Sequence, residues 1–184
     1  MAPDPVLHAL VRAVTDVTGA SAGWLLARAG DELEVVAAQG SEAAAVLGAR
    51  VTAGAGTAGY VVASGQPLAL SGAADDPRLA EGVPALMGRQ PATVLCVACE
   101  VGDDVVGALE VIDKAGGGAF SFDDVELATL LAGIAGTALV ARGASVPDVP
   151  APAELAAGLH RLADADPPQY AAVAAALDAL LHRA

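Results

Sequence analysis

Basic side chains are scarce in this chain of 184 residues. Nine Lys and Arg stand against 22 Asp and Glu, which gives a formal net charge of -13, and the basic residues are spread singly along the sequence. Proteins that bind nucleic acid need clustered cations to neutralise phosphates, and anionic membrane surfaces attract the same clusters. We therefore expect neither nucleic acid nor a membrane among the partners.

Aromatic residues and histidines are also few, with five aromatic side chains and three His. The hydrophobic fraction of 55% consists mainly of Ala, Val and Leu, whose small side chains allow elements to approach closely. With only 17% charged residues, this is the composition of a folded protein and not of a disordered one.

Long apolar runs suited to a membrane are lacking as well. The longest uncharged stretch, residues 51–74, is interrupted by glycines and by Pro67. The first residues, Met1 to Asp4, show neither the basic start nor the apolar run of a secretory signal. We therefore expect a cytoplasmic protein.

The two cysteines, Cys96 and Cys99, lie in residues 93–101, a run with the composition of a strand. Side chains three apart on a strand point to opposite faces, so this pair is not expected to hold a metal or to form a disulfide. We interpret them as two buried thiols, with a redox role as the alternative.

Hydrophobic periodicity divides the first 142 residues into helices and strands. A helix is predicted over residues 5–18 and a hairpin over 22–29 and 32–39, and a second hairpin over 93–101 and 104–113 precedes a long helix that begins at Ser121. Between the hairpins we expect a strand at 68–71 and short helices at 41–48, 57–64 and 77–87. The spacing Gly54-x-Gly56-x-x-Gly59 formally fits a dinucleotide fingerprint, but tight turning explains it better.

The remaining residues form a separate part of the chain. Residues 143–153 are rich in proline and predict a semi-rigid linker, and residues 154–184 predict a helical hairpin. A hairpin of this size cannot bury its apolar faces alone, so it must dock on the main domain, on a second copy or on a partner.

The order of elements predicts an α+β fold over residues 1–142. We expect a central antiparallel sheet of five to six strands, with the N-terminal and long C-terminal helices on one face and a crossover with small helices on the other.

From Val6 to Arg142 the chain resembles a GAF domain, a small-molecule sensor module related to PAS domains. The resemblance rests on the order and spacing of several segments: the opening helix and hairpin, residues 54–67, 73–78, 93–98 and 105–114, and the entry to the last helix at 120–124. It implies the fold described above and a ligand pocket between the sheet and the crossover.

The special activities of the family match this sequence poorly. Cyclic-nucleotide-binding members carry Asn-Lys, then Phe and Asp-Glu. Here Lys114, Phe120 and Asp124 match, but Asp113 and Val125 depart. Bilin- and haem-binding members need a His in the domain's pocket, whereas His8, His160 and His182 lie in predicted terminal helices. The reductases of free methionine sulfoxide place their cysteines differently. We therefore predict no cofactor and no enzyme activity.

Six residues are candidates for lining the implied pocket: Tyr60, Ser64, Asp76, Arg78, Cys99 and Glu110. Glu110 is the most informative, because it is the only charged residue between Val105 and Ile112. A carboxylate there either reaches the pocket, pairs with an Arg or lies at an exposed patch.

These observations favour a non-enzymatic regulatory module that binds a small molecule or a protein partner and signals through a dimer or a helix rearrangement. The expected partners are a second copy of the chain and a protein that carries the output function. The alternatives are a structural dimerisation module with a vestigial pocket and, less favoured, a thiol-based reductase or redox sensor.

Overall fold

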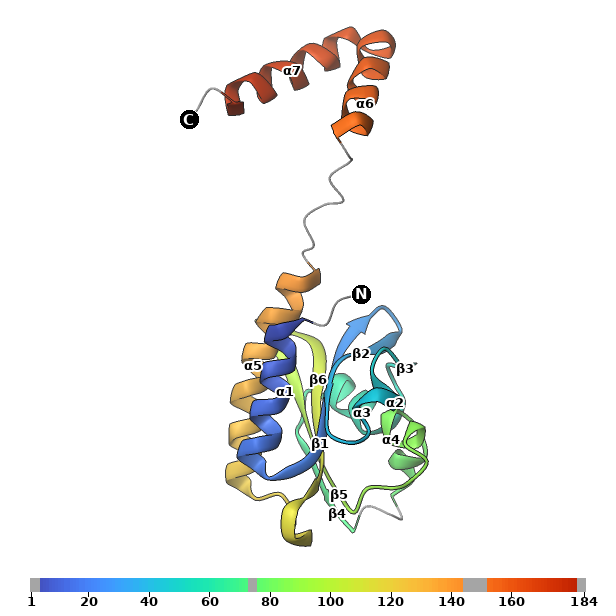
Figure 1. Ribbon diagram of the computed structural model, residues 1–184, viewed down its shortest axis with the longest axis vertical. Helices are drawn as coiled ribbons and strands as arrows, with labels where there is room; N and C mark the ends of the chain where they lie inside the picture. Colours follow the sequence, from blue (N-terminus) through green and yellow to red (C-terminus); the bar gives the residue numbers. More distant parts are fainter. Residues whose placement is uncertain (1–3, 73–75, 144–151, 182–184) are drawn as a thin grey trace. The chain divides into compact units, whose positions relative to one another are not determined.

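The computed structural model describes residues 4–72, 76–143 and 152–181 (Figure 1). The chain divides into two compact units, Met1–Gly143 and Ala144–Ala184. Residues 144–151 of the predicted linker lie outside the described part.

The first unit is built on one antiparallel sheet of six strands in the order β3-β2-β1-β6-β5-β4. The two predicted hairpins form its centre, where β1 (Ala20–Ala29) and β2 (Glu32–Gln39) lie beside β6 (Asp104–Lys114) and β5 (Thr93–Val101). The edges are β4 (Leu68–Ser71) and β3 (Arg50–Thr52). The predicted fold class is confirmed, whereas β3, with three residues, is too short to produce a periodic signal.

The N-terminal helix α1 (Pro5–Thr18) begins and ends as the sequence indicates. The Asp4 carboxylate accepts hydrogen bonds from the backbone N–H groups of Val6 and Leu7, and Gly19 ends the helix in the left-handed conformation with φ 67°. Leu7, Val11 and Val14 on its inner side are completely buried, whereas Val6 and Val17 are exposed.

The long helix α5 (Phe122–Gly143) lies next to α1 on the same face of the sheet (Figure 1). Ser121 and Asp124 exchange hydrogen bonds at its start and so form a capping box. Small residues bring the helix close to the sheet: a Cβ at Gly136 would lie 2.7 Å from the carbonyl oxygen of Glu100. Among the described residues, α5 alone is long and apolar enough to cross a membrane, a test that the core helix of a soluble protein also passes.

The crossover, residues 40–92, covers the other face of the sheet. It contains α2 (Ala43–Val46), α3 (Gly56–Ser64), the 3-10 turn η2 (Pro77–Ala80) and α4 (Val83–Leu86). The single helix predicted over residues 77–87 is therefore two short pieces, because Gly82, with φ 77°, interrupts it.

The sheet separates two apolar layers. Against α1 and α5 it presents side chains that include Leu25, Leu95, Val97 and Leu109, and against the crossover it presents others that include Trp24, Leu26, Cys96 and Ile112. The crossover layer is completed by Ala58, Val61 and Val62 of α3 together with Leu79 and Val83.

The second unit contains α6 (Pro152–Ala165) and α7 (Pro167–Leu181), the predicted helical hairpin. The Asp166 carboxylate accepts a hydrogen bond from the Gln169 N–H and so caps α7. Leu155 and Tyr170 remain exposed.

Candidate functional site

The candidate site is centred on Glu110, in the middle of β6. Register pairs Glu110 with Trp24 of β1 on one side and with Cys96 of β5 on the other. The three side chains form a row across the centre of the sheet on the face that the crossover covers. Glu110 has no exposed surface.

Neutral donors surround the Glu110 carboxyl group. The Trp24 indole Nε1–H donates a hydrogen bond of 3.0 Å to Oε1, and the Thr57 hydroxyl of α3 donates a short one to Oε2. The Cys96 thiol also hydrogen-bonds to this carboxyl group. One side chain thus connects strands β1, β5 and β6 to the crossover.

This environment changes the acidity of Glu110. Burial raises its pKa from 4.5 to about 7, because a carboxylate loses its hydration there, while the hydrogen bonds from Thr57, Trp24 and Cys96 oppose the change. Burial also raises the pKa of Cys96, and the adjacent Glu110 adds to the effect. The Cys96 thiol therefore stays protonated, and Glu110 is the member of the cluster that titrates near neutral pH.

Glycines fix the position of Thr57 over Glu110. Gly56 has φ 71°, and a Cβ there would lie 2.8 Å from the carbonyl oxygen of Glu81. A Cβ at Gly59 would lie 2.6 Å from the carbonyl carbon of Gly54. The glycine pattern thus permits a tight turn into α3 and close backbone packing, in agreement with the interpretation of residues 54–59 as a turn.

The other predicted site residues lie elsewhere. Tyr60 and Ser64 lie on the outer side of α3 and are exposed, and the Ser64 hydroxyl donates to the carbonyl oxygen of Tyr60. Asp76 and Arg78 form an ion pair at the surface, and the Arg78 guanidinium lies 5.4 Å from the centre of the Tyr60 ring. Tyr60, Asp76 and Arg78 are thus brought together, but apart from Glu110.

Cys99 lies on the opposite face of the sheet from Glu110, among the side chains that contact α1 and α5. Burial raises its pKa to about 12. The expectation that Cys96 and Cys99 point to opposite faces agrees with the structure, and Cys96 takes the position beside Glu110. Sequence reasoning missed Trp24, Thr57 and Cys96 as neighbours of Glu110.

The residues of the partial nucleotide motif join β6 to α5. The Lys114 ammonium pairs with the Asp124 carboxylate and lies 5.7 Å from the centre of the Phe120 ring. Asp113 has φ 53° and accepts hydrogen bonds from Arg89 and from the Ala92 N–H. These contacts stabilise the entry to α5 without any ligand.

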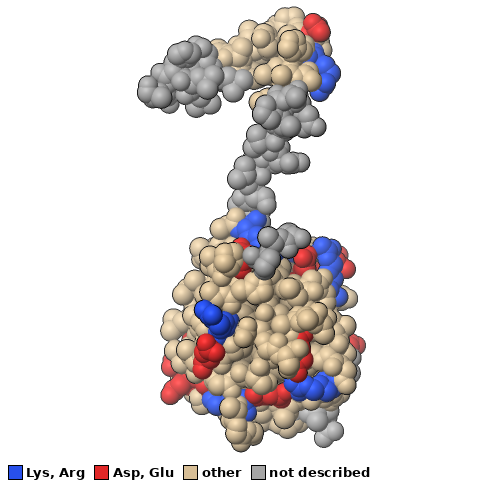
Figure 2. All heavy atoms as spheres, viewed as in Figure 1, with Lys and Arg blue, Asp and Glu red and all other residues tan. Residues whose placement is uncertain are grey.

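The residues described hold no group of three or more His, Cys, Asp or Glu placed to bind a metal ion. The visible surface of the first unit shows charged side chains singly and in small groups between uncharged ones (Figure 2).

The sequence profile of the GAF domain family matches residues 2–139. The chain belongs to the GAF domain family. This match confirms the resemblance seen in the sequence. Domains of this family are typically sensory or regulatory parts of signalling proteins and are generally not catalytic. No curated protein sequence matches the chain significantly.

Solved structures agree with the fold. The GAF domain of a phosphoenolpyruvate-protein phosphotransferase from Coxiella burnetii superposes with a TM-score of 0.65 at 21% identity, covering 78% of this chain and 86% of that one. The GAF-B domain of DevS from Mycobacterium smegmatis gives 0.59 at 20% identity, covering 78% and 96%. A type II free methionine-R-sulfoxide reductase from Thermoplasma acidophilum gives 0.58 at 14% identity, covering 72% and 88%. Identities this low establish the fold alone.

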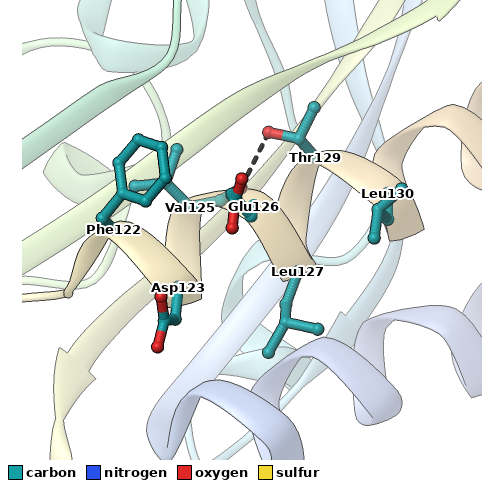
Figure 3. Close-up of a pocket in the computed structure, with 7 residues that line it drawn as sticks. All are labelled: Phe122, Asp123, Val125, Glu126, Leu127, Thr129 and Leu130. Atoms are coloured by element: carbon teal, nitrogen blue, oxygen red, sulfur yellow. Dashed lines mark hydrogen bonds between the residues drawn. The ribbon is translucent and has the colours of Figure 1, made fainter.

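The surface of this GAF domain also carries an apolar groove on α5. Seven residues between Phe122 and Leu130 line a cavity of about 680 Å³, among them Leu127 (Figure 3). Further along the helix, Ile134 and Val140 are also exposed. Exposed apolar side chains gathered on one helix, here interspersed with Asp123, Glu126 and Thr129, are typical of an interaction surface.

Proposed function

We propose that this chain is a cytoplasmic regulatory GAF module that binds a small molecule beneath the crossover and passes the signal on through α1 and α5 in a homodimer. The Glu110 cluster is the observation that carries the proposal. A buried titratable group that joins a short helix to a sheet has the properties expected of a sensing point.

The cluster supports binding because its carboxyl group is costly to bury. Burying a carboxylate is unfavourable unless hydrogen bonds or a cation compensate for the lost hydration. An apolar residue at position 110 would avoid this cost, but it would leave the Trp24 and Thr57 donors without an acceptor. The carboxyl group under α3 is a polar group of this layer that a ligand could recognise.

The sheet offers a direct route from this cluster to the helices. Leu109 and Val111 flank Glu110 on β6 and lie in the apolar layer beneath α1 and α5. A ligand that displaces β6 or α3 would change the packing under both helices. Such small shifts of packed helices are an established means of signalling.

The exposed face of α5 supports the homodimer. Phe122, Leu130 and Ile134 leave 74%, 69% and 55% of their surfaces exposed. A second copy that presents the same face would bury these side chains in an isologous interface. A protein partner with the output function would then respond to the arrangement of the paired helices.

A structural dimerisation module is the second candidate. Complete burial of Glu110 favours it, because the space between sheet and crossover at this point is filled by Trp24, Thr57 and Cys96. In that case the α5 face would be the functional surface and Glu110 would only hold the crossover in place.

A thermal-shift screen separates the two candidates. The panel should contain nucleotides, amino acids, organic acids and amines, and each hit should be repeated on Glu110→Gln. A ligand that raises the melting temperature of the wild type in a concentration-dependent way, and less in the variant, supports sensing beneath the crossover. A panel without hits, with a stable dimer, supports the structural module.

A further inference from the structure

The charge balance around Glu110 indicates which ligand would suit this site. Each of the three hydrogen-bond donors to the carboxyl group is neutral. Among the described residues, none of the ion pairs formed by Arg or Lys includes Glu110. When Glu110 ionises, the neutral donors that contact it stabilise its negative charge through their dipoles. A cationic group beside the carboxylate would stabilise that charge further.

The surrounding side chains restrict the ligand further. The layer between the sheet and the crossover consists of aliphatic residues, the Trp24 ring and the Cys96 thiol. Nucleotides and organic acids would bring a second negative charge to a buried carboxylate, which is strongly unfavourable. Sugars would leave many hydroxyl groups without partners against apolar walls.

From these contacts we propose that the site beneath α3 binds a small protonated amine with an apolar body, whose ammonium group pairs with Glu110 in place of the Thr57 hydroxyl. This inference rests on the proposed sensing function and specifies its ligand class. Trp24 would keep its hydrogen bond to Oε1, while the ligand's ammonium would donate to Oε2.

Entry of the ligand requires α3 to move away from the sheet. Glycines lie at both ends of this helix, with Gly56 at φ 71° and Gly65 at φ 67°. Glycine tolerates a wide range of backbone angles, and the close packing of Gly56 against Glu81 would have to open for the helix to move. Ala58, Val61 and Val62 fix the helix to the sheet by apolar contacts, which the apolar body of the ligand would replace.

The pairing makes the affinity depend on pH. An ammonium ion binds the ionised carboxyl group, so at low pH binding must first release a proton from Glu110. With a pKa of about 7, the ionised fraction rises about tenfold between pH 6 and pH 8, and the dissociation constant should fall by the same factor. The Cys96 thiol, whose pKa burial raises, stays protonated over this range.

The experiment uses 2-phenylethylamine and hexylamine as probes, with 2-phenylethanol and 3-phenylpropionate as matched neutral and anionic controls. Trp24 is the only tryptophan of the chain and contacts Glu110 directly, so its fluorescence reports binding at the site. Titrations at pH 6 and pH 8 are combined with thermal shift.

Two variants and a matched control decide the result. We expect saturable binding of the amines to the wild type, about tenfold weaker at pH 6 than at pH 8. Binding should be lost in Glu110→Gln. It should be kept in the control Glu100→Gln, which removes an exposed carboxylate at the end of β5. Thr57→Val should bind amines at least as tightly as the wild type, because the ligand no longer displaces a hydroxyl group. Circular dichroism verifies the fold of each variant.

Other outcomes overturn the inference in distinguishable ways. Equal binding of the alcohol and the amine, binding of the carboxylate, or unchanged amine binding by Glu110→Gln would refute the ligand class. If amines fail but another compound of the screening panel binds in a Glu110-dependent way, the proposed sensing function stands without this inference. If nothing in either set perturbs Trp24 or the melting temperature, both fail.

Discussion

Replacing Glu110 by Gln should change how the stability of the domain depends on pH. The amide has nearly the same shape and can still accept a hydrogen bond from the Trp24 indole, and its NH₂ group can donate to the Thr57 hydroxyl. It cannot ionise. The variant therefore removes the titration of Glu110 while it preserves the packing at the centre of the sheet.

The direction in which stability changes with pH follows from the pKa values of Glu110 in the unfolded and folded states. Burial raises the pKa of Glu110 from 4.5 to about 7 in the folded state. Below pH 4.5 the group is neutral in both states, and its contribution to stability is fully present. As the pH rises to 7 the unfolded chain ionises first, so that contribution is lost. Above pH 7 the loss reaches about 3 kcal/mol.

The measurement is urea unfolding at a series of pH values, followed by Trp24 fluorescence. Between pH 5.5 and pH 8 the stability of Glu110→Gln relative to the wild type should rise by about 2 kcal/mol. Any change in stability that the amide causes equally at all pH values cancels, because only the change between pH 5.5 and pH 8 is used. Glu100→Gln, an exposed carboxylate on β5, serves as the control and should follow the wild type. A difference between Glu110→Gln and the wild type that stays constant across this range would refute the reasoning.

Three further predictions concern the thiols, the α5 face and the close contact of β1 with β6. Cys96 and Cys99 have no exposed surface, so neither should react with a thiol reagent until denaturant exposes both, and rapid labelling of the folded protein would revive a thiol-based function. Leu130→Asp combined with Ile134→Asp should convert a dimer to a folded monomer, as measured by light scattering. The control Val101→Asp, at the end of a strand, should leave the dimer intact. A monomeric wild type would contradict the proposed dimer. Gly107→Ala should destabilise the domain by about 3 kcal/mol in urea unfolding, because the added Cβ would lie 2.1 Å from the Leu26 carbonyl oxygen. The control Gly133→Ala, which has open space on α5, should be neutral or stabilising. Equal effects of the two substitutions would contradict the close contact at Gly107.

Much of the fold was predictable because its signals are local. Short apolar runs on either side of Gly30-Asp31 and of Gly102-Asp103 identify both hairpins, and a capping residue with a terminal glycine identifies α1. Where several short pieces follow one another the signals overlap. Gly82 was included in a predicted helix that it in fact interrupts, because a glycine in a short apolar segment reads equally well as an interior residue or as a break.

The candidate site was predictable only in part. A lone charge within an apolar strand made Glu110 conspicuous, but its neighbours come from β1, β5 and α3, which are far apart in the sequence. The bulge between Leu25 and Leu26 shifts the register of β1 with β2, and no local pattern shows that Trp24 is opposite Glu110. For Cys96 and Cys99, alternation indicates opposite faces but does not say which thiol faces the crossover.

The placement of Glu110 in the sheet explains how a local event beneath the crossover can reach the surface of α5. Side chains alternate along β6, so Leu109 and Val111 contact the helix layer while Glu110 contacts the crossover. Interiors packed this closely do not absorb a displaced strand, and small residues such as Ala132 and Gly136 leave little free space between α5 and the sheet. A ligand that displaces β6 when it separates Thr57 from Glu110 would therefore shift α5 as well. Because Leu130 and Ile134 lie on the outer side of that helix, any partner bound to them would detect the change.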